Sequence, residues 1–260
     1  MHPILFHLGP LTIYTYGFWV AIGFFAALAF ILSEAKREQI SPSIISDLAF
    51  WCVMSGILGA RLLYVFYNFS YFSQHPLEIP ALWKGGLVFI GGVCLALLSG
   101  VIYVRRYHLD FWQLADLIVP GLALGQAFGR IGCFSAGCCY GKPTHVPWAV
   151  VFKDPFSLAP TGIPLHPTQL YHSLACFVIA FILIWIRRRY FTARLLNPTI
   201  KYGQVFGLYL TLHSIQRFII EFFRGDQRPA ILGTFSFTQL LALILALAGV
   251  IIFIARNKKS

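Results

Sequence analysis

The residues best suited to chemistry lie in a glycine-rich motif at residues 129–141, with the sequence GRIGCFSAGCCYG. The motif places Arg130 and three cysteines directly after residues 117–128, an apolar stretch without any ionisable side chain. An arginine at the end of such a stretch is costly in hydrocarbon unless a partner or water satisfies it. Glycine on both sides allows a ligand or another backbone segment to approach closely. The motif therefore predicts an anion site near a membrane surface.

Three arginines lie inside apolar stretches, namely Arg61, Arg130 and Arg217. The spacing of Arg217, Glu221 and Arg224 (i, i+4, i+7) predicts that they share one face of a helix. A single arginine of this kind can be structural, with its head group reaching water or a partner. Three of them beside glycines or a tyrosine favour anion binding, because a guanidinium group clamps phosphate through parallel hydrogen bonds. We therefore predict a site for a phosphate ester, the anion that bilayers supply.

A histidine opens a second polar group at residues 166–172, with the sequence HPTQLYH. This run stands at the expected start of a helix, where free N–H groups and the helix dipole favour anions. His166 is therefore a candidate site residue. The alternative is that it only caps or packs the helix end.

The six cysteines form two groups. Three of them lie in apolar runs and are expected to be small core residues: Cys52, Cys94 and Cys176. For Cys133, Cys138 and Cys139 three explanations stay open: a metal site with His145 or His166, a disulfide from Cys133 to one of the pair, or packing and a polar lining of the site. The usual C-x₂-C spacing is absent, so we expect no bound metal, and we expect no cofactor.

Composition indicates an all-α integral membrane protein. Of 260 residues, 58% are hydrophobic and 11% are charged, whereas a soluble domain carries roughly 25% charged residues. The formal net charge of +11 does not indicate nucleic-acid binding, because the cations lie between apolar runs and form no single basic face. Length and apolarity predict a single domain, residues 1–260, with about seven membrane-spanning helices. These spans are expected at residues 11–33, 44–67, 86–104, 112–134, 167–186, 203–223 and 235–255.

The charges between the spans predict the orientation. Twelve of the 20 Lys and Arg residues lie in the links after the first, third, fifth and seventh spans, whereas five lie on the other side. The positive-inside bias then places the N-terminus outside and the C-terminus inside. Residues 135–166 are rich in proline and are expected to form a small extramembrane cap on the outer side. The first span has no basic leader and no small-residue cleavage site, so we expect a retained helix rather than a removed signal peptide.

Taken in order, these motifs resemble the prolipoprotein diacylglyceryl transferase family of the bacterial inner membrane. The resemblance covers nearly the whole chain. It rests on residues 9–10 (GP), 14–17 (YTYG), 59–64 (GARLLY), 67–68 (YN), 83–86 (WKGG), 91–92 (GG), 129–141, 166–171 (HPTQLY) and 217–224 (RFIIEFFR). It implies a multi-pass bundle of seven helices with a periplasmic head and an active site toward the periplasmic side.

The resemblance also implies a reaction. The family transfers the diacylglyceryl group of phosphatidylglycerol to the lipobox cysteine thiol of a preprolipoprotein, so that a thioether forms and glycerol phosphate leaves. The implied partners are phosphatidylglycerol, the lipobox-bearing signal peptide and the bilayer; we expect a monomer that binds no nucleic acid.

Residue roles follow from the same resemblance. Phosphate binding is carried over to Arg130 and Arg217, with Glu221 orienting Arg217, and Tyr16 is placed in the site. His166, the candidate at the helix start, completes the catalytic set. The expected substrate-binding residues are Arg61, Tyr64, Asn68, Gly86, Gly91, Gly92, Cys133, Gly137, Gly141, Gln169, Tyr171 and Arg224.

Three positions depart from the family pattern, where members typically carry histidine, asparagine and glutamate: Ile90, Cys133 and Cys138. Isoleucine can neither accept a proton nor donate a hydrogen bond. We therefore expect the charges of Arg130 and Arg217 to lower the pKa of the substrate thiol, with His166 as an auxiliary.

Other functions stay open. A paralogue that binds phospholipid or lipoprotein signal peptides without this chemistry, or that transfers a different group, would share these motifs. A transporter would more often show paired broken helices at mid-membrane, whereas the charges here lie toward the outer face.

Overall fold

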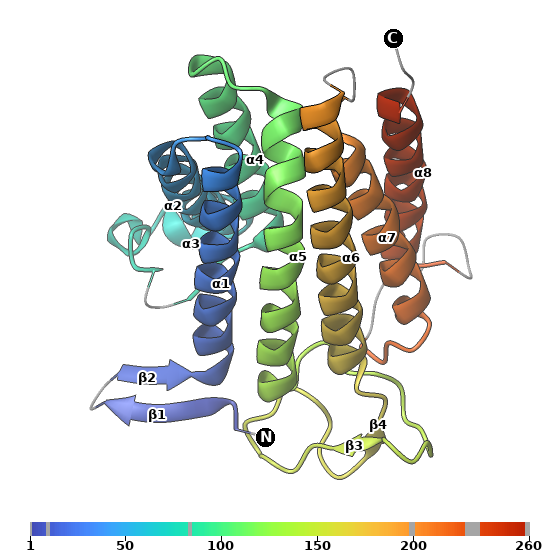
Figure 1. The fold of residues 1–260 in the computed structure, drawn as a ribbon. Helices are drawn as coiled ribbons and strands as arrows, with labels where there is room; N and C mark the ends of the chain where they lie inside the picture. The colour runs from blue at the N-terminus through green and yellow to red at the C-terminus, as the bar shows by residue number, and fades with distance from the viewer. Residues whose placement is uncertain (1, 9–10, 83–84, 198–200, 227–234, 258–260) are drawn as a thin grey trace. The chain divides into compact units, whose positions relative to one another are not determined.

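The computed structural model describes residues 2–8, 11–82, 85–197, 201–226 and 235–257. Long helices dominate this described part (Figure 1). The motif positions 9–10 and 83–84 lie outside it. In chain order the elements are β1 (Ile4–Leu8), β2 (Leu11–Tyr14), α1 (Thr15–Arg37), α2 (Pro42–Tyr67), α3 (Phe69–Phe72), η1 (Pro76–Glu78), α4 (Phe89–Arg106), α5 (Phe111–Ala136), β3 (Val150–Val151), β4 (Pro164–Leu165), α6 (Thr168–Leu196), α7 (Gln204–Glu221) and α8 (Phe237–Asn257).

Six of the described helices are long and apolar enough to cross a membrane: α1, α2, α4, α5, α6 and α8. The predicted all-α membrane fold is thereby confirmed. Helix α7 lies at the predicted sixth span but is not among the six, and its sequence includes polar side chains such as Gln216, Arg217 and Glu221. The first span was predicted to begin too early, because residues 11–14 form β2, which pairs antiparallel with β1.

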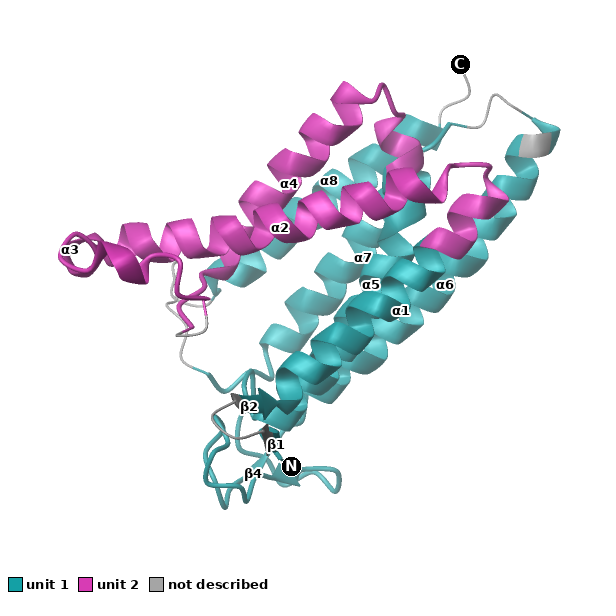
Figure 2. Ribbon diagram, turned by 90° about the vertical axis from the view of Figure 1, so that its left-hand side faces the viewer, with its two compact units in different colours: residues 1–31, 115–260 teal, residues 32–114 magenta. Residues whose placement is uncertain are grey.

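The chain divides into two compact units (Figure 2). Residues 1–31 and 115–260 form unit 1, and residues 32–114 form unit 2. The single-domain prediction stays a prediction.

In unit 1, glycines let the helices approach closely. A Cβ atom on Gly23 of α1 would lie 2.8 Å from the carbonyl oxygen of Gly125 in α5, and one on Gly207 of α7 would lie 2.8 Å from that of Gly249 in α8. Small residues at such crossings stabilise helix pairs in lipid through van der Waals packing. An apolar core joins α5, α6 and α7 and consists of Val119, Ala123, Ile179, Ala180, Leu183, Val205 and Tyr209.

A buried carboxylate holds the start of α7. Asp116 of α5 accepts hydrogen bonds from the N–H groups of Gly203 and Phe206, both at 2.8 Å. It also accepts one from Nη2 of Arg194 at 3.1 Å. Gly203 and Phe206 are the N-cap and third residues of the helix start, where N–H groups have no partner within the helix. The contact therefore sets the position of α7 along α5.

Unit 2 contains α2 and α4, which cross at glycines. A Cβ atom on Gly92 would lie 2.9 Å from the carbonyl oxygen of Gly56, and one on Gly91 would overlap the carbonyl oxygen of Gly59. Both glycines are therefore needed for helix packing. The substrate-binding role predicted for them stays a prediction.

The segment between α5 and α6 corresponds to the predicted cap at 135–166. It contains no helix from residue 137 to residue 167. Strands β3 and β4 pair antiparallel, and Phe152, Ala159 and Leu165 form a small core. Within unit 1 the segment lies at the same end as the N-terminus (Figure 1).

Candidate active site

Gly141 joins three segments of unit 1 that are far apart in the sequence. Its N–H donates to the carbonyl of His166, just before α6, at 3.1 Å. The N–H of Lys142 donates to the carbonyl of Phe223, just after α7, at 2.8 Å. The N–H of Gly225 donates to the carbonyl of Tyr140 at 3.0 Å. A Cβ atom on Gly141 would overlap the carbonyl oxygen of His166 and lie 2.9 Å from that of Phe223. Glycine is therefore required where the three segments meet.

The turn after α5 positions two cysteines. Gly137 (φ 78°) and Cys139 (φ 59°) have left-handed backbone, which is ordinary for glycine and costs about 1–2 kcal/mol for other residues. The first turn of α6 holds this turn in place, because Gln169 Nε2 donates to the carbonyl of Cys138 (2.8 Å) and Thr168 Oγ1 donates to that of Cys139 (2.7 Å). Gln169 therefore acts on the cysteines through their backbone.

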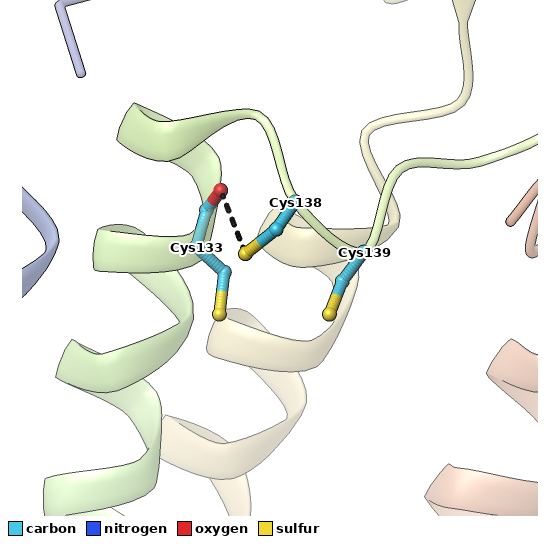
Figure 3. Close-up of side chains that lie close together, drawn as sticks. All are labelled: Cys133, Cys138 and Cys139. Carbon is cyan, nitrogen blue, oxygen red and sulfur yellow. Dashed lines mark hydrogen bonds between the residues drawn. The ribbon is translucent and has the colours of Figure 1, made fainter. Parts of the chain in front are cut away.

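Cys133, Cys138 and Cys139 form a cluster (Figure 3). Their sulfur atoms all lie within 4.8 Å of one another, and the thiols are free. The thiol of Cys138 donates to the carbonyl of Cys133 at 3.7 Å. Hydrogen bonding from the other two thiols, together with the charge of Arg224, lowers the pKa of Cys139. Hydrogen bonding with its two neighbours and burial raise the pKa of Cys138.

Arg217 is held from two sides. Its Nη1 lies 3.1 Å from Nε2 of His172 and 3.1 Å from Oε2 of Glu221. Because arginine can only donate, Nε2 of His172 is the acceptor, and the ring is neutral. The side-chain amide of Gln216 lies 2.6 Å from the other ring nitrogen of His172. His172 is thus a positioning residue for Arg217. The sequence assigned it no role, because its partners lie on α7.

Arg224 does not lie on the same helix as Arg217, because α7 ends at Glu221. It follows the turn after α7 and forms an isolated antiparallel β-bridge with Gly141. Its Nε is still 4.0 Å from Oε2 of Glu221, and it binds Asp226 through two hydrogen bonds of 2.7 and 2.6 Å. Burial opposes its charge, but Asp226 and Cys139 outweigh burial and raise the pKa of Arg224. Its Nη1 is buried without a hydrogen-bond partner among the described residues.

Arg130 completes a group of three cations. It lies in α5, three residues before Cys133. The charges of Arg130, Arg217 and Arg224 all act on the buried ring of His172, and that of Arg130 also acts on Cys133. Unit 1 therefore concentrates three guanidinium groups from α5, α7 and the segment after α7.

His166 contacts this region through its backbone and ring. Its Nδ1 lies 3.2 Å from the hydroxyl of Tyr171, which accepts a hydrogen bond from Trp148 Nε1 at 2.7 Å. The ring packs edge to face on Phe223, with centroids 5.3 Å apart. Tyr171 therefore orients His166.

Tyr16, at the start of α1, lies beside Gly132 of α5. A Cβ atom on Gly132 would lie 3.1 Å from the carbonyl oxygen of Tyr16 and 3.3 Å from its ring. The Cys133 and Cys138 thiols and the charge of Arg130 all lie close enough to influence the Tyr16 hydroxyl. The predicted catalytic residues Tyr16, Arg130, His166, Arg217 and Glu221 thus all lie in unit 1.

Comparison with known proteins supports the resemblance seen in the motifs. The sequence model of the prolipoprotein diacylglyceryl transferase family matches residues 3–255. The chain belongs to this family. Three relatives are named phosphatidylglycerol–prolipoprotein diacylglyceryl transferase. That of Clostridium tetani is 38% identical (97% of this chain, 97% of the relative), that of Desulfotalea psychrophila 37% (98% and 93%), and that of Trichormus variabilis 36% (95% and 88%).

Arg61, a motif residue of unit 2, makes its hydrogen bonds with backbone carbonyls. Arg61 is buried and donates to four backbone carbonyls, at residues 78–79 and 85–86, with distances of 2.6–3.2 Å. It therefore holds the segment after α3 together. The anion contact predicted for Arg61 stays a prediction.

Three further predicted residues lie around the end of α2. Asn68 Nδ2 donates to the carbonyl of Tyr64 at 2.9 Å. A Cβ atom on Gly86 (φ 76°) would overlap the ring of Tyr64. These contacts make the three residues part of the packing of unit 2, and their substrate-binding role stays a prediction.

Proposed function

We propose that this chain is a phosphatidylglycerol–prolipoprotein diacylglyceryl transferase. Family membership over nearly the whole chain and the names of its relatives support this reaction. The structural observation that carries the proposal is that Arg217 and Arg224 both approach the carboxylate of Glu221, at 3.1 and 4.0 Å. Arg130 lies close enough for its charge to act on His172, the partner of Arg217. Guanidinium groups bind phosphate oxygens through paired hydrogen bonds, so this group suits the phosphate of phosphatidylglycerol.

The reaction joins the sulfur of the lipobox cysteine to a carbon of the diacylglyceryl group. The C–S bond forms as the C–O bond to phosphate breaks, and the bonding electrons pass to the phosphate oxygen of the departing glycerol phosphate. Donors fixed beside that oxygen lower the barrier, because negative charge develops there. We assign this role to Arg217, held by His172 and Glu221, to Arg130, and to the buried Nη1 of Arg224.

The substrate thiol must become a thiolate. At an unperturbed pKa of about 8.5 only a few per cent is ionised at neutral pH. Nearby positive charges favour the thiolate, so the same arginines raise the reactive fraction. His166, oriented by Tyr171, is assigned as an auxiliary proton acceptor, and Tyr16 lines the site beside the cysteines.

We assign the site to the outer face of the bacterial inner membrane. The support is the charge asymmetry, with twelve cations in the links on the C-terminal side and five on the other. A reporter fused to the C-terminus should then read as cytoplasmic, and one inserted near Thr161 as periplasmic. The opposite pattern would contradict both the orientation and the outer-face site.

The decisive test is complementation of a bacterium depleted of its own transferase, with the mass of a lipoprotein as readout. Wild type should add a diacylglyceryl thioether. Arg130→Ala and Arg217→Ala should each lower the rate by about 10²–10³. Lysine at either position should restore little, because an ammonium group cannot form the bidentate pair. Arg105→Ala, in the last turn of α4, is the matched control.

Two results would contradict parts of this proposal. Near-wild-type activity in either alanine variant would show that the phosphate is bound elsewhere. If wild type makes no thioether at normal membrane levels while Ile90→His does, the chain is a binding paralogue that lacks this chemistry.

A further inference from the structure

The cysteine cluster has the composition of a metal site. Among the described residues, Cys133, Cys138 and Cys139 are the one group of three or more His, Cys, Asp or Glu side chains whose ligand atoms lie together. Figure 3 shows Cys133 on the last turns of α5 and Cys138 and Cys139 on the turn that follows. The sequence suggested no metal because the usual C-x₂-C spacing is absent, but the two left-handed residues of the turn bring the sulfurs together instead.

Neither a disulfide nor simple packing accounts for the third sulfur. A disulfide would use two of the three thiols. The backbone of Cys139 is left-handed at φ 59°, a conformation that costs about 1–2 kcal/mol and that places its sulfur beside the other two. Thr168 and Gln169 hold the carbonyls of Cys139 and Cys138, so the turn is fixed before any ligand binds.

We propose that the thiolates of Cys133, Cys138 and Cys139 bind one zinc ion, whose fourth coordination position is open to the substrate thiol. Thiolates select soft cations, and zinc sites with three protein ligands and an open position are those that act on substrates. The zinc site stands on the cluster alone. Its role toward the substrate thiol rests on the transferase function proposed above.

The geometry and the charges fit this ion. Zn–S bonds of about 2.3 Å in a tetrahedron place the sulfurs about 3.8 Å apart, whereas the three sulfurs now lie within 4.8 Å of one another. Small rotations of the side chains close that difference. Three thiolates around Zn²⁺ carry one net negative charge, and Arg224 and Arg130 lie close enough to act on Cys139 and Cys133.

The zinc would replace the proton-accepting histidine that family members carry at the position of Ile90, because a bound thiol ionises readily. A lipobox thiol that binds zinc loses its proton to solvent water and becomes a thiolate. Its sulfur attacks the diacylglyceryl carbon, the C–O bond breaks, and glycerol phosphate leaves with the electron pair. The thioether product is a weak ligand and dissociates, so that water returns to the zinc.

The first test is the metal content of the full-length protein purified without chelator. We expect one zinc per chain. Cys133→Ser and Cys139→Ser should each reduce it to near zero, while Cys94→Ser, an exposed thiol in α4, should keep one. Because a serine variant can fail to fold, wild type is also stripped with a chelator and reloaded with cobalt(II), whose near-ultraviolet absorption reports thiolate ligands.

The second test uses the open position and needs no turnover. A lipobox peptide should change the visible spectrum of the cobalt-loaded protein, whereas the same peptide with serine in place of cysteine should not. Protein without stoichiometric zinc, or with a disulfide among the three cysteines, would overturn the inference even if transfer were normal. If the cysteine peptide leaves the cobalt spectrum unchanged, the substrate thiol does not bind at the open position, and that part of the proposal is wrong. Zinc binding in a chain that makes no thioether would keep the metal site and reject the transferase function.

Discussion

Replacing Gly141 with alanine tests whether the meeting point of three segments assembles the site. The new Cβ atom would overlap the carbonyl oxygen of His166 and lie 2.9 Å from that of Phe223, and neither backbone atom can rotate away. Overpacking of this kind costs about 1–3 kcal/mol, and each of the hydrogen bonds made there by Gly141, Lys142 and Gly225 contributes about 0.5–1.5 kcal/mol. If all three hydrogen bonds are lost, the free energy of unfolding should fall by about 2.5–7.5 kcal/mol.

Activity should fall further than stability alone explains. A displacement of about 1 Å in a catalytic group can cost about 10² in rate, and the displaced segments carry Cys139 and Arg224. Thermal unfolding of the purified protein and transfer per folded molecule are the two measurements. Gly100→Ala is the control, because its Cβ atom would make only ordinary contacts, the nearest at 3.5 Å from Cys52 Sγ. A Gly141→Ala protein with unchanged unfolding temperature and activity would refute the reasoning.

Three further substitutions test separate parts of the structure. His172→Ala should lower kcat about tenfold or more with little change in KM, because Arg217 loses the hydrogen bond that positions it from α6. An unchanged kcat would contradict the positioning role. Asp116→Ala should cost about 3–5 kcal/mol of stability, because it leaves Arg194 buried without its carboxylate. Transfer per folded molecule should persist. An unfolding temperature equal to that of wild type would contradict this expectation. Ile90→His should be tolerated or mildly beneficial, since Ile90 is 65% exposed and has room for the new ring. A large loss of transfer in the complementation assay would contradict this expectation.

The sequence by itself determined the membrane fold and one ion pair. Each span is a local property, because the length and apolarity of one run decide whether it can cross a bilayer. The second span, expected at residues 44–67, is α2 at Pro42–Tyr67. The contact of Arg217 with Glu221 was equally predictable, because residues four apart on a helix are always neighbours. The family resemblance followed from motifs read in order.

Only the tertiary structure decided how the site is assembled. His172 could not be recognised from the sequence, because its role depends on Gln216 and Arg217, which reach it from another helix. The spacing of the three cysteines does not reveal that the left-handed turn at residues 137–139 brings their sulfurs together. The four carbonyls that Arg61 contacts were equally hidden, because they belong to residues 17 to 25 positions further along the chain. The physical reason is common to all three: a side chain's chemistry depends on which atoms surround it, and those atoms come from segments that the sequence does not place side by side.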